Sequence, residues 1–512
     1  MNATYDKLFR NKHALKASAG YQLMTSRREY DNGRGFSIQS DFYKTMGKSD
    51  ASYGLTTDGY LDKWSWLNLY LTAGYGYKNQ LFLDGTVTFD ASSAYGDSHS
   101  RMVVLPSVRG AWAMKNSSFL RDVDGIETLT LRAEYGRSAN SRYSSELGRY
   151  YYQSVAYRDL AGIIRVGLPN SKLGPEYVLS ANAGLDLSLL GNRLNLNVDF
   201  YQEDTRDMLL GKTMPSAYGE EVMYDNSGEM RTRGVEVGLN FMPLKVGGFQ
   251  WMLGGNIAHY QTKVLDLGNQ RERFLTSADG LTLRLKEGCS PYEFYGYEAE
   301  HIFVSQRDAD AAGYIAQSGT AFQAGDIKFK DMNGDHIIDD KDRKALGSAT
   351  PDFYGGFFSN MNYKGFNLYV NFSYSYGNEI YNAVRKTGES MSTFTNQFAT
   401  VSNRWTYDGQ GTNMPRAVFG DPMENNRFSS RWIEDGSYLK LKEITLSYEY
   451  SRKLWFFNRI KVYVSGENLY TWTKYIGLDP EFAYSYDPMM SGVDMGKMPL
   501  ARTGKIGVVL NF

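Results

Sequence analysis

A short acidic segment near residue 335 has the residue types and the spacing of a calcium-binding loop. Positions 1, 3, 5, 9 and 12 of an EF-hand-like loop are taken by side-chain oxygens, and position 7 offers a backbone carbonyl. In order, the six residues are Asp331, Asn333, Asp335, Ile337 (the carbonyl at position 7), Asp339 and Asp342. Because calcium binds about six to eight oxygen ligands, the sequence predicts a Ca2+ site formed by these residues.

Two departures from the motif keep a second interpretation open. His336 stands at position 6, where glycine normally permits the sharp turn, and Asp342 has a shorter reach than the usual glutamate. The alternative is an Asx-rich turn cluster that binds no metal. In both cases the expected role is to stiffen a loop, and no catalysis is implied.

Other reactive residues do not form a recognisable catalytic pattern. None of the five histidines has the spacing of a zinc or metalloprotease site, and acidic pairs such as Glu220-Glu221 are typical of solvated loops. The single Cys289 excludes an internal disulfide framework and a zinc cluster. A net charge of −1 gives no basic surface for nucleic acid. We therefore expect neither an enzyme nor a nucleic-acid-binding protein.

The elements that must position these residues are strands with one apolar face. In the segment LYVNFSYSY (368–376), Leu, Val, Phe and two Tyr alternate with Tyr, Asn and two Ser. Since side chains alternate between the faces of a strand, one face is apolar and the other is small and polar. The same pattern recurs near 129–135, 194–200 and 235–241. Many such segments predict an antiparallel transmembrane β-barrel with a wet lumen.

Composition agrees with a membrane barrel. The chain has 40 Tyr, 27 Phe and 8 Trp, and these aromatic side chains suit the two membrane interfaces. Mean hydropathy is only −0.46, but a barrel strand shows lipid just every second residue. The alternative is a large soluble β-protein, although no propeller-like repeat of about 40 to 50 residues is present.

The alternation predicts about 15 long strands. They are expected near 11–25, 34–47, 65–77, 79–91, 101–114, 126–138, 177–190, 192–206, 229–243, 248–264, 351–363, 365–377, 437–450, 457–471 and 500–512. The last one ends in KIGVVLNF, an amphipathic strand that closes on the aromatic Phe512 and resembles the recognition signal of outer-membrane proteins.

The predicted connections fall into two classes. Tight turns are expected at Lys78-Asn79, Gly191-Asn192 and Lys364-Gly365, where Asn and Gly accept positive φ. Long extracellular loops are expected at 139–176, 207–228, 265–350, 378–436 and 472–499. The stretch 265–350, which contains the acidic turn, is too long to lack structure and should form an external substructure. Loop aromatics such as Tyr150-Tyr151-Tyr152, Trp472 and Tyr475 suit stacking on sugar rings or gripping peptides, and they suit even better a place at the membrane interface or packing within the loops.

Several blocks carry a resemblance to a known family. They include LPSVRGAWAM (105–114), NSGEMRTRGVEVGLNF (226–241), GDIKFKDMNGDHIIDDKDRKALGSATPDFYGGF (325–357), RWIEDGSYLKLKEITLSYEY (431–450) and GENLYTWTKYIGLDPE (466–481). In this order they resemble the C-terminal half of the SusC/RagA family of TonB-dependent outer-membrane transporters of Bacteroidota. The resemblance extends over nearly the whole chain, so we expect residues 1–512 to belong to the transmembrane β-barrel.

The resemblance implies a fold and a set of partners. The family barrel has about 22 strands, so this chain is expected to supply about 15 of them, with no plug domain and no signal peptide. An N-terminal barrel and plug portion would come from a separate polypeptide or from unseen upstream sequence, and TonB would act through that portion. A SusD-like surface lipoprotein would cover the long loops.

The resemblance also implies an activity. The expected function is that of an outer-membrane component, embedded in lipid, for TonB-dependent uptake of oligosaccharides or peptides. One alternative is a non-transporting barrel that serves as a structural subunit of an outer-membrane complex, and another is a passive pore without a plug. Loop aromatics serve sugars and peptides equally, so the substrate stays open.

Overall fold

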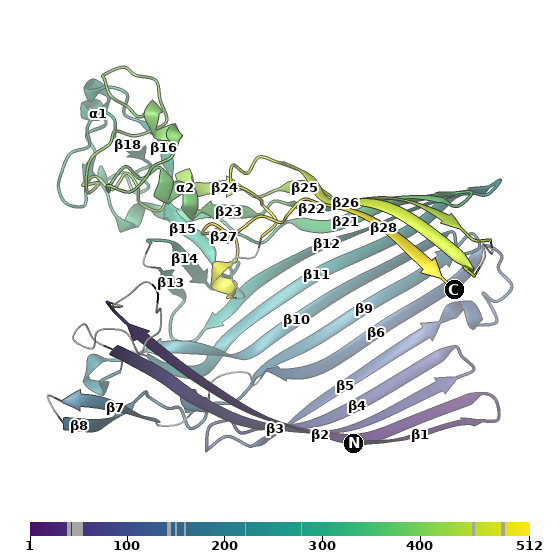
Figure 1. Ribbon diagram of the computed structural model, residues 1–512. Helices are drawn as coiled ribbons and strands as arrows, with labels where there is room; N and C mark the ends of the chain where they lie inside the picture. Colours follow the sequence, from purple (N-terminus) through teal and green to yellow (C-terminus); the bar gives the residue numbers. More distant parts are fainter. Residues whose placement is uncertain are drawn as a thin grey trace.

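Fifteen strands form one antiparallel sheet that curves into a wall (Figure 1). The computed structural model describes residues 1–37, 42, 55–140, 145–148, 151–157, 160–220, 222–277, 279–452, 456–482 and 487–512. In sheet order the strands are β1 (Asn2–Phe9), β2 (His13–Gly35), β3 (Leu55–Tyr77), β4 (Leu81–Ser92), β5 (Met102–Ala113), β6 (Ile126–Asn140), β9 (Glu176–Leu189), β10 (Leu194–Thr213), β11 (Val222–Val246), β12 (Phe249–Leu267), β21 (Phe353–Tyr363), β22 (Phe366–Tyr376), β25 (Tyr438–Tyr450), β26 (Arg459–Thr473) and β28 (Thr503–Asn511).

The register of the sheet lines up apolar side chains into rows. One row crosses five strands, because each residue is the Cα partner of the next: Leu131, Leu185, Val198, Val237 and Ile257. The positions next along these strands face the other way and carry polar residues, among them Arg132 and Asp199. Such rows give the wall one apolar and one polar face, as a transmembrane barrel requires.

Short turns lie at one end of the wall and long connections at the other (Figure 1). The predicted tight turns are confirmed: φ is +50° and +52° at Lys78 and Asn79, and +47° and +91° at Lys364 and Gly365. Gly191 and Asn192 also have positive φ, which fits the Asn and Gly preference of such turns. In outer-membrane barrels the end with long loops is extracellular.

The number of strands matches the prediction, and the strand expected at 11–25 is confirmed as part of β2, but one strand was missed and the next assignment, 34–47, is wrong in its described residues. A separate strand precedes the one expected at 11–25, since β1 pairs with β2 from Asn2↔Gly20 to Phe9↔His13. The strand expected at 34–47 begins with the end of β2, and 38–41 and 43–47 lie outside the described residues. Local alternation missed β1 because it is short and mixes polar and apolar residues on each face.

Because β1 precedes it, the segment 11–25, which is the first strand expected from the sequence, does not form the edge of the sheet. The segment 11–25 pairs on both sides, with β1 and with β3, whereas the sheet ends at β1 and β28. Within the described chain these two strands do not pair with each other.

One expected loop is mostly strand. Most of 207–228 continues the ladder, because β10 runs to Thr213 and pairs with Val222 at the start of β11. A bulge near Met208 interrupts the ladder without ending it. Residues 207–213 (DMLLGKT) do not alternate between apolar and polar side chains, so the pattern from which we predicted strands is missing there.

The long connections contain short elements of their own. These are β7 (Tyr151–Tyr157), β8 (Leu160–Val166), β13 (Glu272–Thr276), β14 (Thr282–Lys286), β15 (Glu293–Tyr297), β16 (Ala299–Ile302), α1 (Gln306–Ala312), β17 (Ile315–Ala316), β18 (Ile327–Phe329), β19 (Ile337–Ile338), β20 (Arg343–Gly347), β23 (Glu379–Asn382), α2 (Ala383–Gly388), β24 (Ile433–Asp435) and β27 (Val493–Asp494). Neither helix in the described part of the chain is long and apolar enough to cross a membrane.

Three long connections fold together into one unit, which we call the loop assembly. It comprises the described residues of 268–352, 377–437 and 474–502. One of its cores joins Phe303 and Phe329 to Met423, and a second joins Phe294 to Trp432 and Val493. Residues 265–350 therefore share their cores with the other two connections rather than folding alone.

Candidate functional site: the loop assembly and the wall below it

The polar face of the wall holds a charged network on β6, β9 and β10. Arg132 Nε donates to Asp186 Oδ2 at 2.8 Å, and Arg132 Nη2 donates to Asp199 Oδ2 at 3.0 Å. Gly184 lies between them, and a Cβ there would come within 2.6 Å of Asp199 Oδ1. The absence of a side chain at Gly184 thus leaves room for one arginine to bind two carboxylates on neighbouring strands.

A second ion-pair network ties the loop assembly to the wall. Lys440 of β25 is buried, and its Nζ lies 2.8 Å from both Asp479 Oδ1 and Glu481 Oε2. Lys442, two residues along the same strand, lies 2.9 Å from Glu481 Oε1. Because the two carboxylates belong to the connection between β26 and β28, they hold that connection against the wall.

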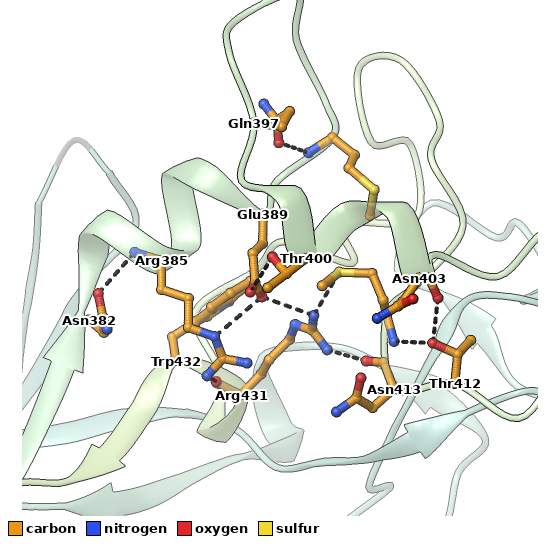
Figure 2. Close-up of polar contacts among 12 residues, drawn as sticks. Asn382, Arg385, Glu389, Gln397, Thr400, Asn403, Thr412, Asn413, Arg431 and Trp432 are labelled. Atoms are coloured by element: carbon orange, nitrogen blue, oxygen red, sulfur yellow. Dashed lines mark hydrogen bonds and ion pairs between the residues drawn. The ribbon is translucent and has the colours of Figure 1, made fainter. Parts of the chain in front are cut away.

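Inside the loop assembly, two arginines share one buried glutamate (Figure 2). Arg385 Nε lies 3.2 Å from Glu389 Oε2, and Arg431 Nη2 lies 3.3 Å from the same oxygen. Thr400 Oγ1 donates to the other oxygen of Glu389 at 3.0 Å. Arg385 also bonds Glu434, so two guanidinium groups face two carboxylates. This cluster joins α2 to the segment that precedes β24.

Arg431 is the more deeply buried of the two arginines in this cluster. Its side chain is 10% exposed, and its Nε has no hydrogen-bond partner. Burial lowers the pKa of Arg431 to about 10, and the negative charge of Glu389 opposes that shift. Trp432 lies beside both arginines, with its ring centroid 5.0 Å from the Arg431 guanidinium. Arg431 therefore stays protonated at neutral pH.

Polar cavities open beside these residues. One of about 300 Å3 is lined by Arg385, Arg431, Asn413 and His301 among others. A larger cavity of about 590 Å3 is lined by Tyr295, Tyr297, Asp279 and Arg343 among others. Both offer mixtures of hydrogen-bond donors, acceptors and, in the larger cavity, aromatic surface, which suits polar ligands of modest size.

The acidic segment forms a network of turns that surrounds its own backbone. Asp331 accepts hydrogen bonds from the backbone N–H groups of Gly334 and His336, at 2.6 and 2.9 Å. Asp342 is fully buried and accepts from the N–H groups of Met332 and Asp339. These are the contacts expected of the Asx-rich turn interpretation.

The calcium ligands stay a prediction. Lys341 Nζ lies 3.5 Å from Asp339 Oδ2 and 3.8 Å from Asp335 Oδ2, so an ammonium group stands near two of the expected ligands. Within the described ranges, no three His, Cys, Asp or Glu side chains are grouped so as to hold a metal ion. The expected carbonyl of Ile337 belongs to the short strand β19.

The loop aromatics have different surroundings. Tyr475 is buried and donates to Asp494 Oδ2 at 2.6 Å, which is a packing role. Trp472 is exposed near the end of β26, as an interface or ligand-contacting residue would be. Tyr150 lies outside the described residues, and Tyr152 is exposed in β7.

Sequence reasoning missed the residues that join the loop assembly together. Arg431, Lys440, Asp479 and Glu481 all fall within the two conspicuous blocks at 431–450 and 466–481. The charged residues within a strand-like block could have indicated that these positions are functional. Nothing in the local pattern, however, indicates that Lys440 contacts Asp479. Arg385 and Glu389 lie in no block that we singled out.

Comparisons with known proteins agree on the family. Residues 2–469 match the family described as TonB dependent receptor-like, beta-barrel. TonB-dependent receptor P3 of Formosa agariphila is 29% identical over 99% of this chain and 51% of its own length. TonB-dependent receptor SusC of Bacteroides thetaiotaomicron is 25% identical over 86% of this chain and 43% of its own length.

The fold is shared with a solved transporter. The RagAB peptide transporter structure has a TM-score of 0.83 at 23% identity, and the match covers 100% of this chain and 55% of that chain. This chain thus spans about half the length of the curated relatives it matches. A wall of fifteen amphipathic strands and a match over residues 2–469 lead to one conclusion: the chain belongs to the β-barrel family of TonB-dependent receptors, which are outer-membrane proteins similar to SusC.

Proposed function

We propose that this chain forms the wall and the extracellular loops of a SusC-type, TonB-dependent importer of oligosaccharides or peptides. The observation that carries the proposal is the loop assembly, a folded unit with polar cavities at the long-loop end of a barrel wall. A ligand would contact the loops first and then pass the polar face that carries Arg132 and its two carboxylates.

The proposal includes partners. A SusD-like lipoprotein would cover the loop assembly, and a plug would close the lumen until TonB displaces it. The plug and the remaining strands would come from another segment of the protein or from a second polypeptide. Two facts support this part: β1 and β28 each have a paired neighbour on one side only within the described chain, and lipid supplies no donors or acceptors to an open edge.

Uptake by cells that carry the complete transporter tests the function. Fluorescent neutral oligosaccharides and fluorescent peptides of matched size are offered to cells with the intact gene, with the gene deleted, and with the proton-motive force collapsed. We expect one ligand class to accumulate only in energised cells that carry the gene. Pull-down from detergent extracts, with a tag on this chain, should then recover a surface lipoprotein.

The other functions predict different results. If the pull-down recovers the surface lipoprotein but energised cells take up neither oligosaccharides nor peptides, the result would favour the structural subunit. Uptake that survives collapse of the proton-motive force would favour a passive pore. Either result would contradict the proposed importer.

A further inference from the structure

We infer that Glu379 is a proton-operated switch that sets how firmly the three connections of the loop assembly are joined at the rim of the barrel. This inference concerns the coupling between the loops and the wall. It holds whether or not the protein imports a nutrient, because it rests on contacts among the chain's own segments.

Glu379 lies where all three connections meet. It begins β23, which follows β22 directly and pairs antiparallel with β24 and parallel with β27. Its backbone N–H donates to Ser348 O at 2.9 Å, and the N–H of Tyr381 donates to Gly492 O at 2.8 Å. Through β24, β27, Ser348 and Gly492, the three connections 268–352, 377–437 and 474–502 meet at β23. We call this meeting point the rim junction.

The side chain of Glu379 is half-buried at this junction. Its Oε2 is buried and has no hydrogen-bond partner. A Cβ placed on Gly347 would overlap that oxygen, so the carboxyl fills the space that a side chain at Gly347 would need. Gly347 has φ of +135°, a conformation that favours glycine. When the carboxyl group is ionised, Oε2 has no hydrogen-bond partner here that would stabilise the negative charge.

The neighbouring charges add to the cost of ionisation. Asp435 of β24 is the register partner of Glu379, and like charges opposite each other destabilise a strand pair. The positive charge of Lys474 favours the ionised form of Asp435. Glu434 is next to Asp435 and therefore faces the other side of the strand, where it bonds Arg385. On β27, Asp494 accepts a hydrogen bond from Tyr475 Oη.

These surroundings determine the direction of the pH dependence. Burial, and then the charge of Asp435, raise the pKa of Glu379 from 4.5 to about 7. A raised pKa means that the folded junction binds the proton more tightly than the unfolded chain does. The resulting stabilisation is complete below about pH 4.5 and is lost as the pH rises through about 7. The junction is thus firm in acid and looser above neutrality.

Hydrogen–deuterium exchange of the complete protein in detergent tests the switch. The opening constant of the rim junction is measured for peptides that contain Tyr381, with intrinsic exchange rates corrected at each pH. For the wild type we expect opening to rise about tenfold or more between about pH 5 and about pH 8. Glu379→Gln, which is neutral at every pH, should keep the junction closed and give a flat profile.

Two further variants make the result specific. Glu424→Gln removes a carboxylate that is 71% exposed in the same assembly, and its profile should match the wild type. Asp435→Asn removes the opposing charge, so its midpoint should move to lower pH without vanishing. A flat wild-type profile, an unchanged profile in Glu379→Gln, or an unmoved midpoint in Asp435→Asn would each overturn the inference. Should Glu379→Gln fail to fold, the Asp435→Asn midpoint decides.

Discussion

The barrel wall and the loop assembly distribute apolar residues in opposite ways. In the wall, Leu446, Val464 and Ile506 are register partners across three strands, and all three are exposed. In the loop assembly, Phe303, Phe329 and Trp432 are almost completely buried. Both regions belong to one chain, yet one is apolar outside and the other is apolar inside.

The difference follows from the solvent that each region meets. Lipid accepts apolar side chains, so the wall needs polar groups only toward its lumen and at its ends. Water does not, so the loops must bury their aromatic residues against one another. The buried aromatic core of the loop assembly is therefore what we expect of a region that is surrounded by water rather than by lipid.

The loop core offers the largest effect with which to test this comparison. Phe329 is 0% exposed, and Phe329→Ala should destabilise the loop assembly by about 3–5 kcal/mol through lost burial and a cavity. Limited proteolysis should show faster cleavage within 268–352, while the barrel keeps its heat-modifiable migration on gels. Leu446→Ala, an exposed wall position, serves as the control and should leave loop cleavage unchanged. Equal cleavage in both variants would contradict a separate core.

A charge on the lipid-facing side should be costly only where lipid is present. Leu239 in β11 is 42% exposed and Val304 in the loop assembly is 38% exposed. Leu239→Arg should cost about 2–4 kcal/mol in barrel unfolding from lipid vesicles, depending on its depth. Val304→Arg should stay within about 0.5 kcal/mol, because its surroundings are water. Similar costs for the two variants would show that Leu239 does not face lipid.

Breaking the ion pairs of Lys440, which connect the loop assembly to the wall, should have an intermediate effect. Lys440→Met leaves Asp479 without its cation, whereas Glu481 keeps Lys442. We expect a loss of about 2 kcal/mol, confined to the connection between β26 and β28. Hydrogen exchange of peptides covering 474–482 should rise, and exchange of β25 should not. Lys461→Met on the neighbouring strand β26 is the control and should leave 474–482 as in the wild type.

Calcium should have the smallest effect. If Asp331, Asn333, Asp335, Asp339 and Asp342 bind calcium, a structure with the ion should show oxygens at about 2.3–2.6 Å. Calcium should then slow proteolysis of 325–347, and replacing Asp331 and Asp335 by Ala should remove that protection without unfolding the barrel. No protection at saturating calcium would leave the Asx-rich turn cluster as the interpretation.

Much of the wall could be predicted because its signal is local. Alternation in segments such as 368–376 predicts a strand with two unlike faces, and Asn or Gly between two such segments predicts a hairpin turn. Lys364 and Gly365 show this directly, with positive φ between β21 and β22. The strand β1 escaped prediction because its pairing with β2, rather than an apolar face of its own, makes it a strand.

The candidate site could be predicted only in part. The blocks that contain Arg431, Lys440 and Asp479 were visible, but their pairing was not. Arg385 meets Glu389 through one turn of helix, whereas its contact with Glu434 joins positions that are 49 residues apart. A local pattern carries no information on such pairings, because they depend on which connections come together at the rim.

By itself, then, the sequence determined the strand-rich class, the two-faced wall and the division into tight turns and long connections. Each of these follows from side-chain periodicity and turn chemistry within about ten residues. Only the tertiary structure decided that Met423 completes the core around Phe303, that Lys440 holds Asp479, and that Glu379 lies opposite Asp435. Those contacts join distant segments, and burial and charge pairing select them only after the chain has folded.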